Sequence, residues 1–497
     1  MKILLVNPQT PLTFWSFKYA LKFVSRKSSE PPLGLLTVAA MLPKEWEKKL
    51  VDLNIEKLRD KEILWADFVF ITGMDIQRES FIRVVEQCNR LERKVVAGGP
   101  MCTMDPGQFE EVEGLRIDHF VLNEAELTLP MFLSDLKEGK PKHMYTSHEF
   151  PDITQTPVPA WNLLKMKKYA SMSIQYSRGC PFNCEFCSIG FLNGHRTRTK
   201  SAEQFVNELD SLYRWGWRGG VFIVDDNFIG NKEKLKREVL PAMREWQREK
   251  KYPFSFITEA SINIADDDEL INLMTEAGFD SAFIGIETVN EESLNECGKN
   301  QNKHRDILAA VRKLQNRGIS VSGGFIVGFD NDTSEIFEQQ KNFIQKSGIV
   351  TAMVGLLNAP QHTRLFERLK RENRIVKSRI DGNNMDMDIN FIPKMDMSAL
   401  KEGYRQLLEK IYSPAQYYER VKTFLNNYEP AQKYVRVPLN HIGAFLKAIW
   451  KLGIVERGRL LFWKLIIKTL IRYPQKISTA VTMAIYGFHF RKVVEKI

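Results

Sequence analysis

The stretch from Ser177 to Gly190, SRGCPFNCEFCSIG, holds three of the six cysteines of this 497-residue chain. Cys180, Cys184 and Cys187 follow the spacing C-x3-C-x2-C. Three thiolates on one tight loop can bind three corners of an iron–sulfur cube and leave the fourth iron open to a substrate or cofactor. The alternative is a zinc site with His195 as the fourth ligand, although structural zinc sites more often use two Cys pairs and this sequence has no second pair. The spacing therefore favours an iron–sulfur cluster.

Around this loop, apolar runs and helical patterns alternate over about residues 171 to 375, with no antiparallel hairpin signal between them. The runs are SIQYS, VFIVDD, FSFITEA, SAFIGIE, VSGGFIVGF and TAMVGLL, and the helical patterns cover 201–215, 232–249, 266–277, 303–317, 333–346 and 361–373. Six parallel β/α units predict a partial (β/α)6 barrel of the TIM type, whose active face lies at the carboxyl ends of the strands. The cysteine loop follows the first strand and falls on that face.

With Phe186 as the aromatic residue, the motif C-x3-C-x-aromatic-C after the first strand of a β/α array resembles the radical S-adenosylmethionine (SAM) enzymes. The resemblance implies that the three cysteines ligate a [4Fe–4S] cluster whose open iron chelates SAM. One electron from the cluster would cleave SAM and release a 5′-deoxyadenosyl radical, which abstracts a hydrogen from the substrate. For each single carboxylate at a strand tip, a salt bridge is the alternative. The implied SAM contacts are Phe186, Asp226, Glu259, Gly285 and Glu287.

Residues 1 to 140 also alternate strand patterns (KILLVNP, KLVDLN, DFVFITGM, KVVAGGP, DHFVLNEAE) with helix patterns (PPLGLLTVAAMLP, ESFIRVVEQCNRLERK). This alternation predicts a doubly wound, Rossmann-like α/β domain with a parallel sheet. Ligands of such sheets bind at the carboxyl ends of the strands, where glycine lets a backbone approach closely. Simple turn glycines are the alternative. The candidate binding residues are Pro8, Gly73, Gly98, Gly99, Pro100, Asn123 and Glu124.

A doubly wound domain directly before such a barrel resembles the cobalamin-binding radical SAM subfamily, and PPLGLLTVAA, the GGP turn at 98–100 and VLNEAE are the similar segments. The resemblance implies that cobalamin binds at those strand ends. Domains that ligate cobalt through histidine carry D-x-H-x-x-G after the first strand. Here the loop after Pro8, QTPLTFWSFKYALKF, has no histidine. The lower face of a bound cobalamin is therefore expected to lack a histidine ligand.

GMDIQRES, SRGCPFNCEFCSIG, VDDNFIGN and YRQLLEKIYSPAQYYERV (404–421) resemble the branch that contains the hopanoid C-2 methylase. This implies transfer of a methyl group from methylcobalamin to an unactivated carbon, two SAM molecules per turnover, and an electron donor such as flavodoxin or ferredoxin. The branch is wider than hopanoid enzymes, so the expected substrate is a hydrophobic small molecule, of which a lipid or isoprenoid is one kind. The sequence departs from the branch at Thr363-Arg364, where relatives often show Thr-Pro. We expect these two residues either to contact a different substrate or to start a helix.

Two other function classes stay open. One is a cobalamin-dependent radical SAM enzyme that does not methylate, such as a cyclase or an oxidoreductase. The other is a non-catalytic scaffold stabilised by metal. The sequence singles out no catalytic acid or base.

Three further regions complete the predicted domain organisation. Residues 141–170 are expected to be a linker, because Pro151, Pro157 and Pro159 exclude helix and central strand there. After the barrel, residues 376–440 are expected to hold a polar loop or lid and an accessory helical stretch. Residues 441–497 are expected to form a basic, amphipathic helical tail.

The tail contains eleven basic and two acidic residues, and so +9 of the net charge of +10. The nearly neutral remainder excludes a nucleic-acid surface over the body of the protein. Lys464, Lys468, Arg472 and Lys476 recur every four residues beside large apolar side chains, which is typical of a helix lying in an anionic membrane surface. Packing on the protein body or on a partner is the alternative.

Composition and hydropathy fit a globular protein of several domains, with 43% hydrophobic and 27% charged residues. Six cysteines in 497 residues exclude a disulfide-built secreted scaffold. MKILLVNP is typical of a first strand rather than of a secretory signal. The longest late stretch without a charged residue, 477–490, is shorter than the ~20 residues of a spanning helix. We therefore expect a cytoplasmic protein, peripheral at the membrane through its tail.

Overall fold

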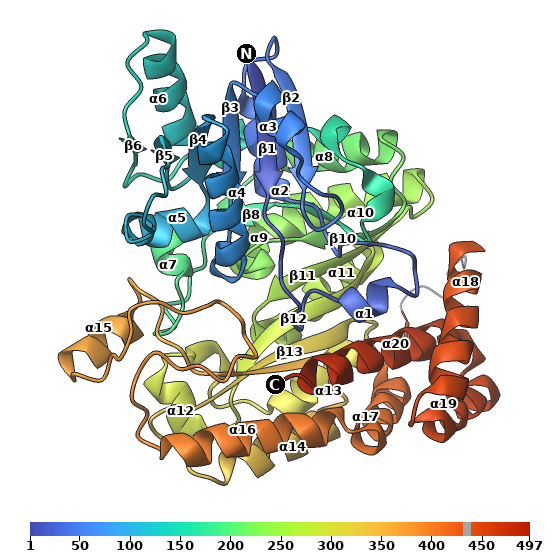
Figure 1. Ribbon diagram of the computed structural model, residues 1–497. Coiled ribbons are helices and arrows are strands. Elements are labelled where there is room, and N and C mark those ends of the chain that lie inside the picture. The colour runs from blue at the N-terminus through green and yellow to red at the C-terminus, as the bar shows by residue number, and fades with distance from the viewer. Residues whose placement is uncertain (431–438) are drawn as a thin grey trace.

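Two parallel sheets organise the part of the chain that the computed structural model describes, residues 1–430 and 439–497 (Figure 1). The first sheet has the order β2-β1-β3-β4-β5-β6, and every neighbouring pair is parallel. It confirms the predicted doubly wound domain and adds one strand, β6, which is too short to show a sequence pattern. Its strands are β1 (Lys2–Asn7), β2 (Glu47–Asp52), β3 (Phe68–Thr72), β4 (Lys94–Gly98), β5 (His119–Val121) and β6 (Met144–Tyr145).

Helices cover both faces of this sheet because its strands are apolar on both sides. In β1, Ile3 and Leu5 point into one apolar layer and Leu4 and Val6 into the other, as the two-residue period of a strand requires. The first layer is closed by α2 (Leu33–Met41) and α6 (Ala125–Lys137). The second is closed by α3 (Asp60–Trp65), α4 (Arg78–Arg90) and α5 (Pro100–Met104).

The second sheet runs β7-β10-β11-β12-β13-β14, so its strands follow one another in chain order, all parallel. This order confirms the predicted partial barrel. Its strands are β7 (Met172–Ile174), β10 (Gly219–Ile223), β11 (Phe254–Ala260), β12 (Phe279–Glu287), β13 (Ser320–Val327) and β14 (Ala352–Leu356). The main helices that follow them are α8 (Ala202–Arg214), α10 (Leu240–Glu249), α11 (Asp268–Ala277), α13 (Ile307–Asn316), α14 (Ile336–Ser347) and α15 (Arg364–Arg371).

An antiparallel hairpin interrupts the parallel pattern between the first two barrel strands. It pairs β8 (Ser177–Arg178) with β9 (Arg198–Thr199). The sequence shows no hairpin signal here because each strand has only two residues. The hairpin closes the loop that carries the three cysteines and the short helix α7 (Ile189–Leu192).

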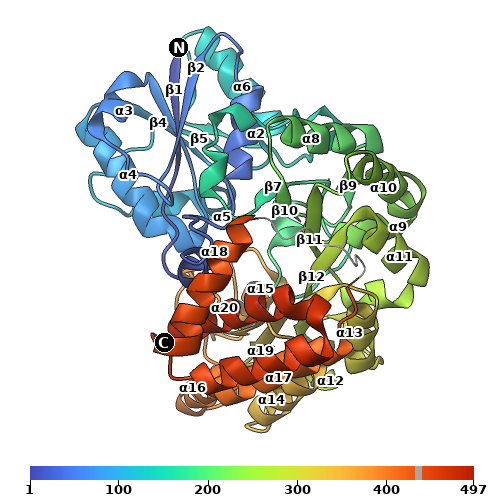
Figure 2. The same cartoon turned by 90° about the vertical axis from the view of Figure 1, so that its right-hand side faces the viewer.

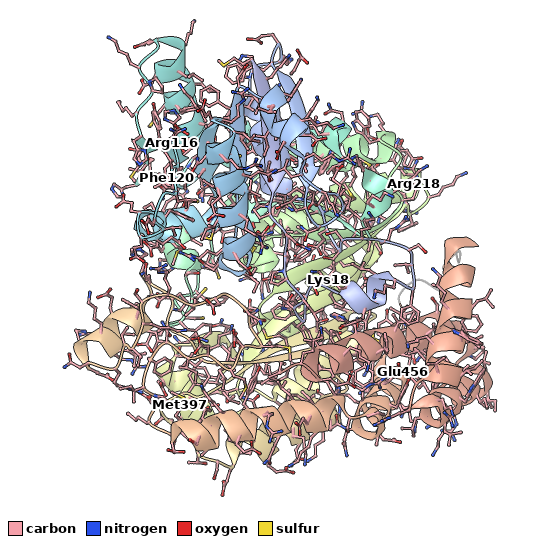
Figure 3. All side chains as sticks on the ribbon, viewed as in Figure 1. Lys18, Arg116, Phe120, Arg218, Met397 and Glu456 are labelled. Atoms are coloured by element: carbon pink, nitrogen blue, oxygen red, sulfur yellow. The ribbon has the colours of Figure 1, made fainter. Side chains whose placement is uncertain are left out.

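The C-terminal helices pack beside the barrel and extend its core (Figure 2). They are α16 (Met397–Tyr412), α17 (Pro414–Asn427), α18 (Leu439–Ala448), the π-helical η10 (Ile449–Val455), α19 (Arg459–Arg472) and α20 (Ile477–Val494). The ring of Phe490 in α20 stacks on Phe14, with centroids 4.1 Å apart and planes 7° apart. The short helix α1 (Lys18–Leu21), on which Figure 3 labels Lys18, contacts α20 as well. Among the described residues, no helix has the length and apolar content to cross a bilayer.

Candidate active site

The cysteine loop is fixed where it leaves β8. Gly179 has φ +88°, and a Cβ at this position would lie 2.6 Å from the Arg196 carbonyl oxygen, so the turn needs glycine. The Cys180 amide donates to the Gly194 carbonyl (3.2 Å), and the Cys187 amide donates to the Cys184 carbonyl (3.1 Å). The three cysteines thereby share one compact turn beyond the carboxyl end of β7.

Two carboxylates that follow β10 hold this turn from the barrel side. Asp225 is buried and accepts hydrogen bonds from the amides of residues 176 and 177, both at 2.8 Å. Asp226, an expected SAM contact, accepts from the Gly179 amide (2.8 Å) and the Asn193 side-chain amide (2.9 Å). Burial raises the pKa of both carboxyls, that of Asp225 to about 7. The role that the structure gives Asp226 is to support the cysteine loop.

A buried ion pair lies beside the cysteines. Lys299 Nζ is 2.6 Å from Glu287 Oε1, and both side chains are about nine-tenths buried. Gly285 leaves the space that this pair fills, because a Cβ there would overlap the Glu287 carboxylate and lie 2.8 Å from Lys299 Nζ. Burial acts to lower the pKa of Lys299, but Glu287 and the thiols of Cys184 and Cys187 more than offset this and raise it. Lys299 therefore keeps a positive charge next to the cysteine loop.

The backbone at the end of β12 is held in an uncommon conformation. Glu287 has φ +64°, which a non-glycine residue adopts only where its surroundings fix it. The Asn302 side-chain amide donates to the carbonyls of residues 285 and 286, at 3.1 and 2.9 Å. Next to it, Gln301 Nε2 lies 3.9 Å from Cys184 Sγ. The end of β12 and residues 299–302 thus form one wall of the site.

Glu259 at the end of β11 is the one expected SAM contact with a carboxylate that forms no hydrogen bond in the described part of the chain. Burial, together with the nearby carboxyls of Asp226 and Glu30, raises its pKa to about 7. Glu30 comes from the first domain, and burial raises its pKa to about 7 as well, against the lowering effect of its bond to Ser173. The half-buried ring of Phe186 faces Phe329, with centroids 6.4 Å apart.

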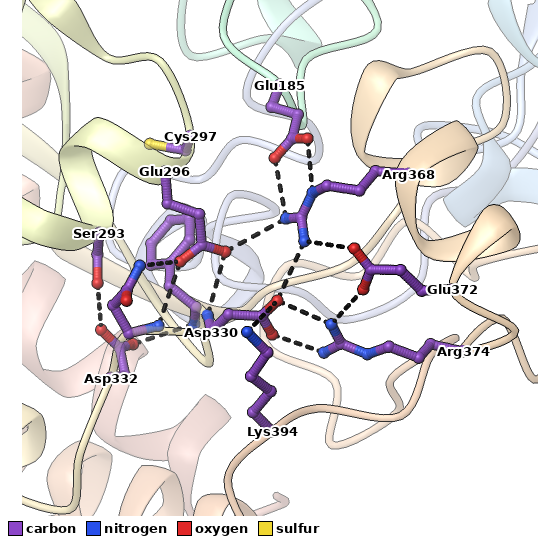
Figure 4. Close-up of polar contacts among 12 residues, drawn as sticks. Glu185, Ser293, Glu296, Cys297, Asp330, Asp332, Arg368, Glu372, Arg374 and Lys394 are labelled. Carbon is purple, nitrogen blue, oxygen red and sulfur yellow. Dashed lines mark hydrogen bonds and ion pairs between the residues drawn. The ribbon is translucent and has the colours of Figure 1, made fainter.

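An ion-pair network holds the outer side of the cysteine loop (Figure 4). Arg368, on α15, binds Glu185 through two hydrogen bonds of 2.8 and 3.0 Å. The same guanidinium reaches Asp330 (3.0 Å) and Glu296 (3.3 Å). Paired hydrogen bonds of this kind fix direction as well as distance. The network therefore connects the loop to α15, to the segment after β13 and to α12 (Glu291–Glu296).

The unusual Thr363-Arg364 pair starts a helix and also contacts the cysteine loop. The Thr363 side chain caps α15 by accepting from the Phe366 amide (3.1 Å). Arg364 Nη1 donates to the Asn183 carbonyl (3.1 Å). Only the contact of Arg364 depends on the residue that sets this chain apart, because a Thr-Pro sequence has the same capping threonine.

The glycines expected at the cobalamin site are explained by contacts within the first domain. Gly99 has φ +88°, and a Cβ there would overlap Thr72 Oγ1. A Cβ at Gly98 would lie 2.5 Å from the Val121 carbonyl oxygen. Gly73 is less restricted, because the atom nearest to a Cβ there is the flexible end of the Met101 side chain, at 3.0 Å. Gly98 and Gly99 therefore need glycine for close packing of strand ends, whether or not a ligand approaches them.

The other expected cobalamin residues also lie at strand ends. The Pro8 carbonyl after β1 accepts from Gln77 Nε2 (2.8 Å), and Pro100 is the first residue of α5. Asn123 after β5 has φ +60°, and its side-chain oxygen accepts from Thr146 Oγ1 (2.7 Å). All of them follow the carboxyl ends of strands of the first sheet, and in Figure 1 these strand ends point towards the barrel.

The last of these residues, Glu124, binds the barrel domain. Its carboxylate pairs with Arg178 (2.6 Å) and Arg198 (2.5 Å), one from each strand of the β8–β9 hairpin. Glu126 adds a second bond to Arg178 (2.8 Å). The four side chains are only 7 to 14% exposed, so water screens these pairs little. This Glu124–Glu126 clamp joins the end of β5 to the base of the cysteine loop.

Sequence reasoning missed several of the groups that shape the site: Glu30, Arg178, Arg198, Lys299, Gln301 and Arg368. Arg178 stands inside SRGC, next to the first cysteine, so a signal for it was present. Lys299 and Arg368 occur in polar stretches where any charged residue is ordinary. Their partners become visible only when the chain is folded.

The zinc alternative finds no fourth ligand at His195, which is exposed and whose Nδ1 lies 3.3 Å from the Phe182 carbonyl. Among the side chains that the structure describes, those of residues 1–430 and 443–497, no three His, Cys, Asp or Glu groups converge on the position of a single metal ion. A cube does not require such convergence, because each cysteine binds a different iron. Three thiols on one turn, beside a buried ammonium, suit an anionic iron–sulfur cluster.

Family models match the three parts of the chain. The B12 binding domain matches residues 22–133, the Radical SAM superfamily matches 174–344, and a model described as a domain of unknown function, DUF4070, matches 363–497. Among solved structures, the cobalamin-dependent SAM radical enzyme OxsB covers all of this chain and 80% of its own, with a TM-score of 0.63 at 15% identity. The match to the radical SAM methyltransferase TsrM from Kitasatospora setae covers 93% of this chain and 97% of the TsrM chain, with a TM-score of 0.59 at 16% identity. At these identities, the likeness concerns the fold.

Two curated relatives match over almost their whole length. An uncharacterised methyltransferase of Synechocystis sp. is 39% identical over 99% of this chain and 91% of its own. The hopanoid C-2 methylase of Rhodopseudomonas palustris is 33% identical over 95% of this chain and 90% of its own length. The family models that match this chain imply a [4Fe–4S] cluster, SAM and cobalamin as its cofactors. The chain belongs to the cobalamin-binding radical SAM methyltransferases.

Proposed function

We propose that this enzyme methylates an unactivated carbon of a hydrophobic small molecule, of the lipid or isoprenoid class. The observation that carries the proposal is the Glu124–Glu126 clamp, through which the end of β5 in the first domain grips the hairpin of the cysteine loop. In this proposal, the strand ends that would bind cobalamin face the loop that would hold the cluster, because the clamp joins the two. The 33% identity to a hopanoid C-2 methylase supports the substrate class.

When bound, the cluster supplies the electron that cleaves SAM, and cobalamin supplies the methyl group. Cys180, Cys184 and Cys187 would hold the cluster. Lys299 would offset part of its negative charge, because its ammonium is fixed by Glu287 at 2.6 Å and lies near the thiols.

Polar groups around the cysteine loop would orient SAM. Glu259 is suited to the amino group or the ribose hydroxyls, because its carboxylate has no partner within the described residues. Glu287 would act through Lys299, and Asp226 through the Gly179 amide that it binds. Gly285 and Phe186 would provide apolar contact for the adenosine. At the first domain, the backbone at Pro8, Gly73, Gly98 to Pro100 and Asn123 would contact cobalamin.

The proposed partners are an electron donor such as flavodoxin or ferredoxin and, for access to a water-insoluble substrate, the surface of a membrane. The proposed place of action is the cytoplasm. We also propose that the domains divide at about residues 140, 170, 375 and 440.

The test is an anaerobic assay of the protein reconstituted with iron, sulfide and hydroxocobalamin, supplied with SAM and a reductant. We expect 5′-deoxyadenosine and S-adenosylhomocysteine together, and a product heavier than its substrate by one CH2. Deoxyadenosine without S-adenosylhomocysteine would favour a non-methylating enzyme. If neither forms, or if the protein takes up no corrinoid, the proposal is wrong.

A further inference from the structure

The helices α18, η10 and α19 expose an unusual number of large apolar side chains. Eight of the twenty exposed large hydrophobic residues in the described chain fall between residues 446 and 471. Leu460 is 78% exposed, Ile471 77% and Trp450 64%, so these side chains stand out from the surface. We name this set the outer apolar face; its members are Leu446, Trp450, Ile454, Val455, Leu460, Ile467, Leu470 and Ile471.

The outer apolar face is not an uncovered part of the core. The opposite side of α19 is already packed, with Phe462, Leu465 and Ile466 buried. Trp463 lies between the helices, where its indole N–H donates to the Gly453 carbonyl (2.9 Å). A helix on the surface of a globular protein normally has one apolar side. Here α19 has two apolar sides, and the outer one is removed from water only if it makes a further contact.

Along the chain, the outer members recur at helical spacing. Leu446, Trp450 and Ile454 are four residues apart and line one side of α18 and η10, while Leu460, Ile467 and Ile471 line one side of α19. Both helices lie at the outer edge of the molecule in Figure 1. The face therefore combines one side of each of two helical segments, η10 and α19, that contact each other.

Basic side chains surround this face. Within the described residues, none of the following forms an ion pair with a carboxylate: Arg457, Arg459, Lys464, Lys468 and Arg472. Lys447 is not counted here, because its ammonium donates to Ser25 Oγ (2.7 Å) on the protein body. The one acidic residue of the segment, Glu456, is mostly buried and is paired with Lys451 (3.3 Å) and Arg491 (3.0 Å). The charge that the face presents to its surroundings is thus positive.

We propose that the outer apolar face docks the enzyme on an anionic lipid surface. Protruding apolar side chains among unpaired cations match acyl chains below anionic headgroups. Two copies of this face would bring like charges together, which argues against a dimer contact. The surface differs from the stripe expected from the sequence, because Lys476 is buried against the Leu425 carbonyl (3.1 Å) and Glu429 (2.8 Å). The proposal deepens the proposed function by naming how its substrate would be reached, and it does not require that function to be correct.

The test is co-sedimentation of the full-length, reconstituted protein with vesicles of phosphatidylcholine alone or with 30% phosphatidylglycerol. We expect pelleting with the anionic vesicles that weakens at high salt. The variant W450E/I471E should bind at least tenfold more weakly, and K464Q/K468Q should lose most of the preference for anionic lipid. W215E is the matched control, because Trp215 is 54% exposed but lies at the end of α8, and it should bind like the wild type.

Circular dichroism and deoxyadenosine formation in the same samples show whether each variant is folded and active. Vesicle binding needs no turnover, so its loss and a failure of the methylase proposal give separate results. Equal pelleting of wild type and W450E/I471E would overturn the proposal. So would the absence of binding to anionic vesicles, which would leave an acidic protein as the partner, or a dimer in sedimentation that W450E/I471E abolishes.

Discussion

At the scale of single residues, the cysteines near the site are of two kinds, which differ in their surroundings. Cys180, Cys184 and Cys187 share one turn, whereas Cys297 is a buried thiol behind the loop whose backbone carbonyl accepts from the Glu185 amide (2.8 Å). Alanine can keep that backbone bond but cannot ligate iron. The two kinds of position therefore make a matched comparison.

We expect Cys184→Ala to lose the [4Fe–4S] cluster and all deoxyadenosine formation, because a cube bound by two thiolates is no longer held at three corners. Cys297→Ala should keep about four iron atoms per chain and its activity. Iron and sulfide analysis after anaerobic reconstitution measures the first effect and chromatography of the SAM products the second. Deoxyadenosine formed by Cys184→Ala would show that this cysteine is not a ligand.

Glu259 makes the stability of the cofactor-free protein depend on pH. Its pKa rises from 4.5 to about 7 on folding, so between these values the folded state binds more protons than the unfolded state. Stability therefore falls as pH rises through this range. We expect Glu259→Gln to stabilise the cofactor-free protein at pH 8 by up to about 3 kcal/mol and to have little effect at pH 5. Thermal unfolding at both pH values measures this, and an equal shift at both would contradict it.

The same substitution should weaken SAM binding by about ten- to a hundredfold, since a hydrogen bond to a charged group contributes roughly 1.5–3 kcal/mol. Isothermal titration of the reconstituted protein with SAM checks this. Asp226→Asn is the useful comparison. That residue supports the cysteine loop through Gly179, so its substitution should reduce cluster content, which Glu259→Gln should leave intact.

At the scale of elements, the β8–β9 hairpin depends on charges from another domain. Glu124 is 7% exposed and pairs with two arginines. Removing one partner of a buried ion pair destabilises a protein by roughly 3–5 kcal/mol, because it leaves an unpaired charge. We expect Glu124→Ala to lower the free energy of unfolding by about 3 kcal/mol and to reduce cluster retention. Urea unfolding and iron analysis measure the two effects.

The control for this prediction is Glu79→Ala, which breaks an exposed pair with Arg83 (2.6 Å) in the same domain. An exposed pair contributes less than about 1 kcal/mol. If Glu124→Ala and Glu79→Ala have equally small effects, the clamp does not hold the hairpin.

The same element shows how far the sequence could predict this site. The cysteine spacing and the alternation of apolar runs were enough for the loop, both sheets and the order of the domains, because these depend on local period. The hairpin strands have only two residues each, which is too short for a repeating pattern of apolar residues in the sequence. The partners of Arg178 are more than fifty residues away in the chain, and no local pattern encodes which charges will meet.

At the scale of the whole molecule, the two ends of the chain are packed together. His489 in α20 is buried between Phe14 and Tyr19 of the segment after β1. The Phe14 carbonyl (2.8 Å) can only accept, so His489 Nε2 carries a proton, and the Tyr19 amide (3.4 Å) donates to Nδ1. This contact ties the C-terminal helix to the N-terminal domain.

Protonation of His489 would place an N–H on Nδ1 against the N–H of Tyr19. Burial lowers the pKa of His489 from 6.5 to about 4, against the raising effect of its bonds to backbone carbonyls, so the unfolded state binds a proton before the folded state does as pH falls. The stability that this contact contributes is present above pH 6.5 and is lost as pH falls towards 4. Between pH 7.5 and pH 5 the loss is about 2 kcal/mol. The C-terminal helix should therefore loosen in mild acid while the barrel stays folded.

We expect His489→Gln to remove most of this pH dependence, because a glutamine amide can donate to Phe14 and accept from Tyr19 without titrating. Hydrogen exchange of the α20 amides at pH 7.5 and pH 5, corrected for the intrinsic rate, measures the local effect. In the wild type, α20 should lose protection at pH 5, and in His489→Gln it should lose much less. His148→Gln, at an exposed histidine, should behave like the wild type. If α20 loses the same protection in His489→Gln as in the wild type, another group controls how the two ends of the chain are held together.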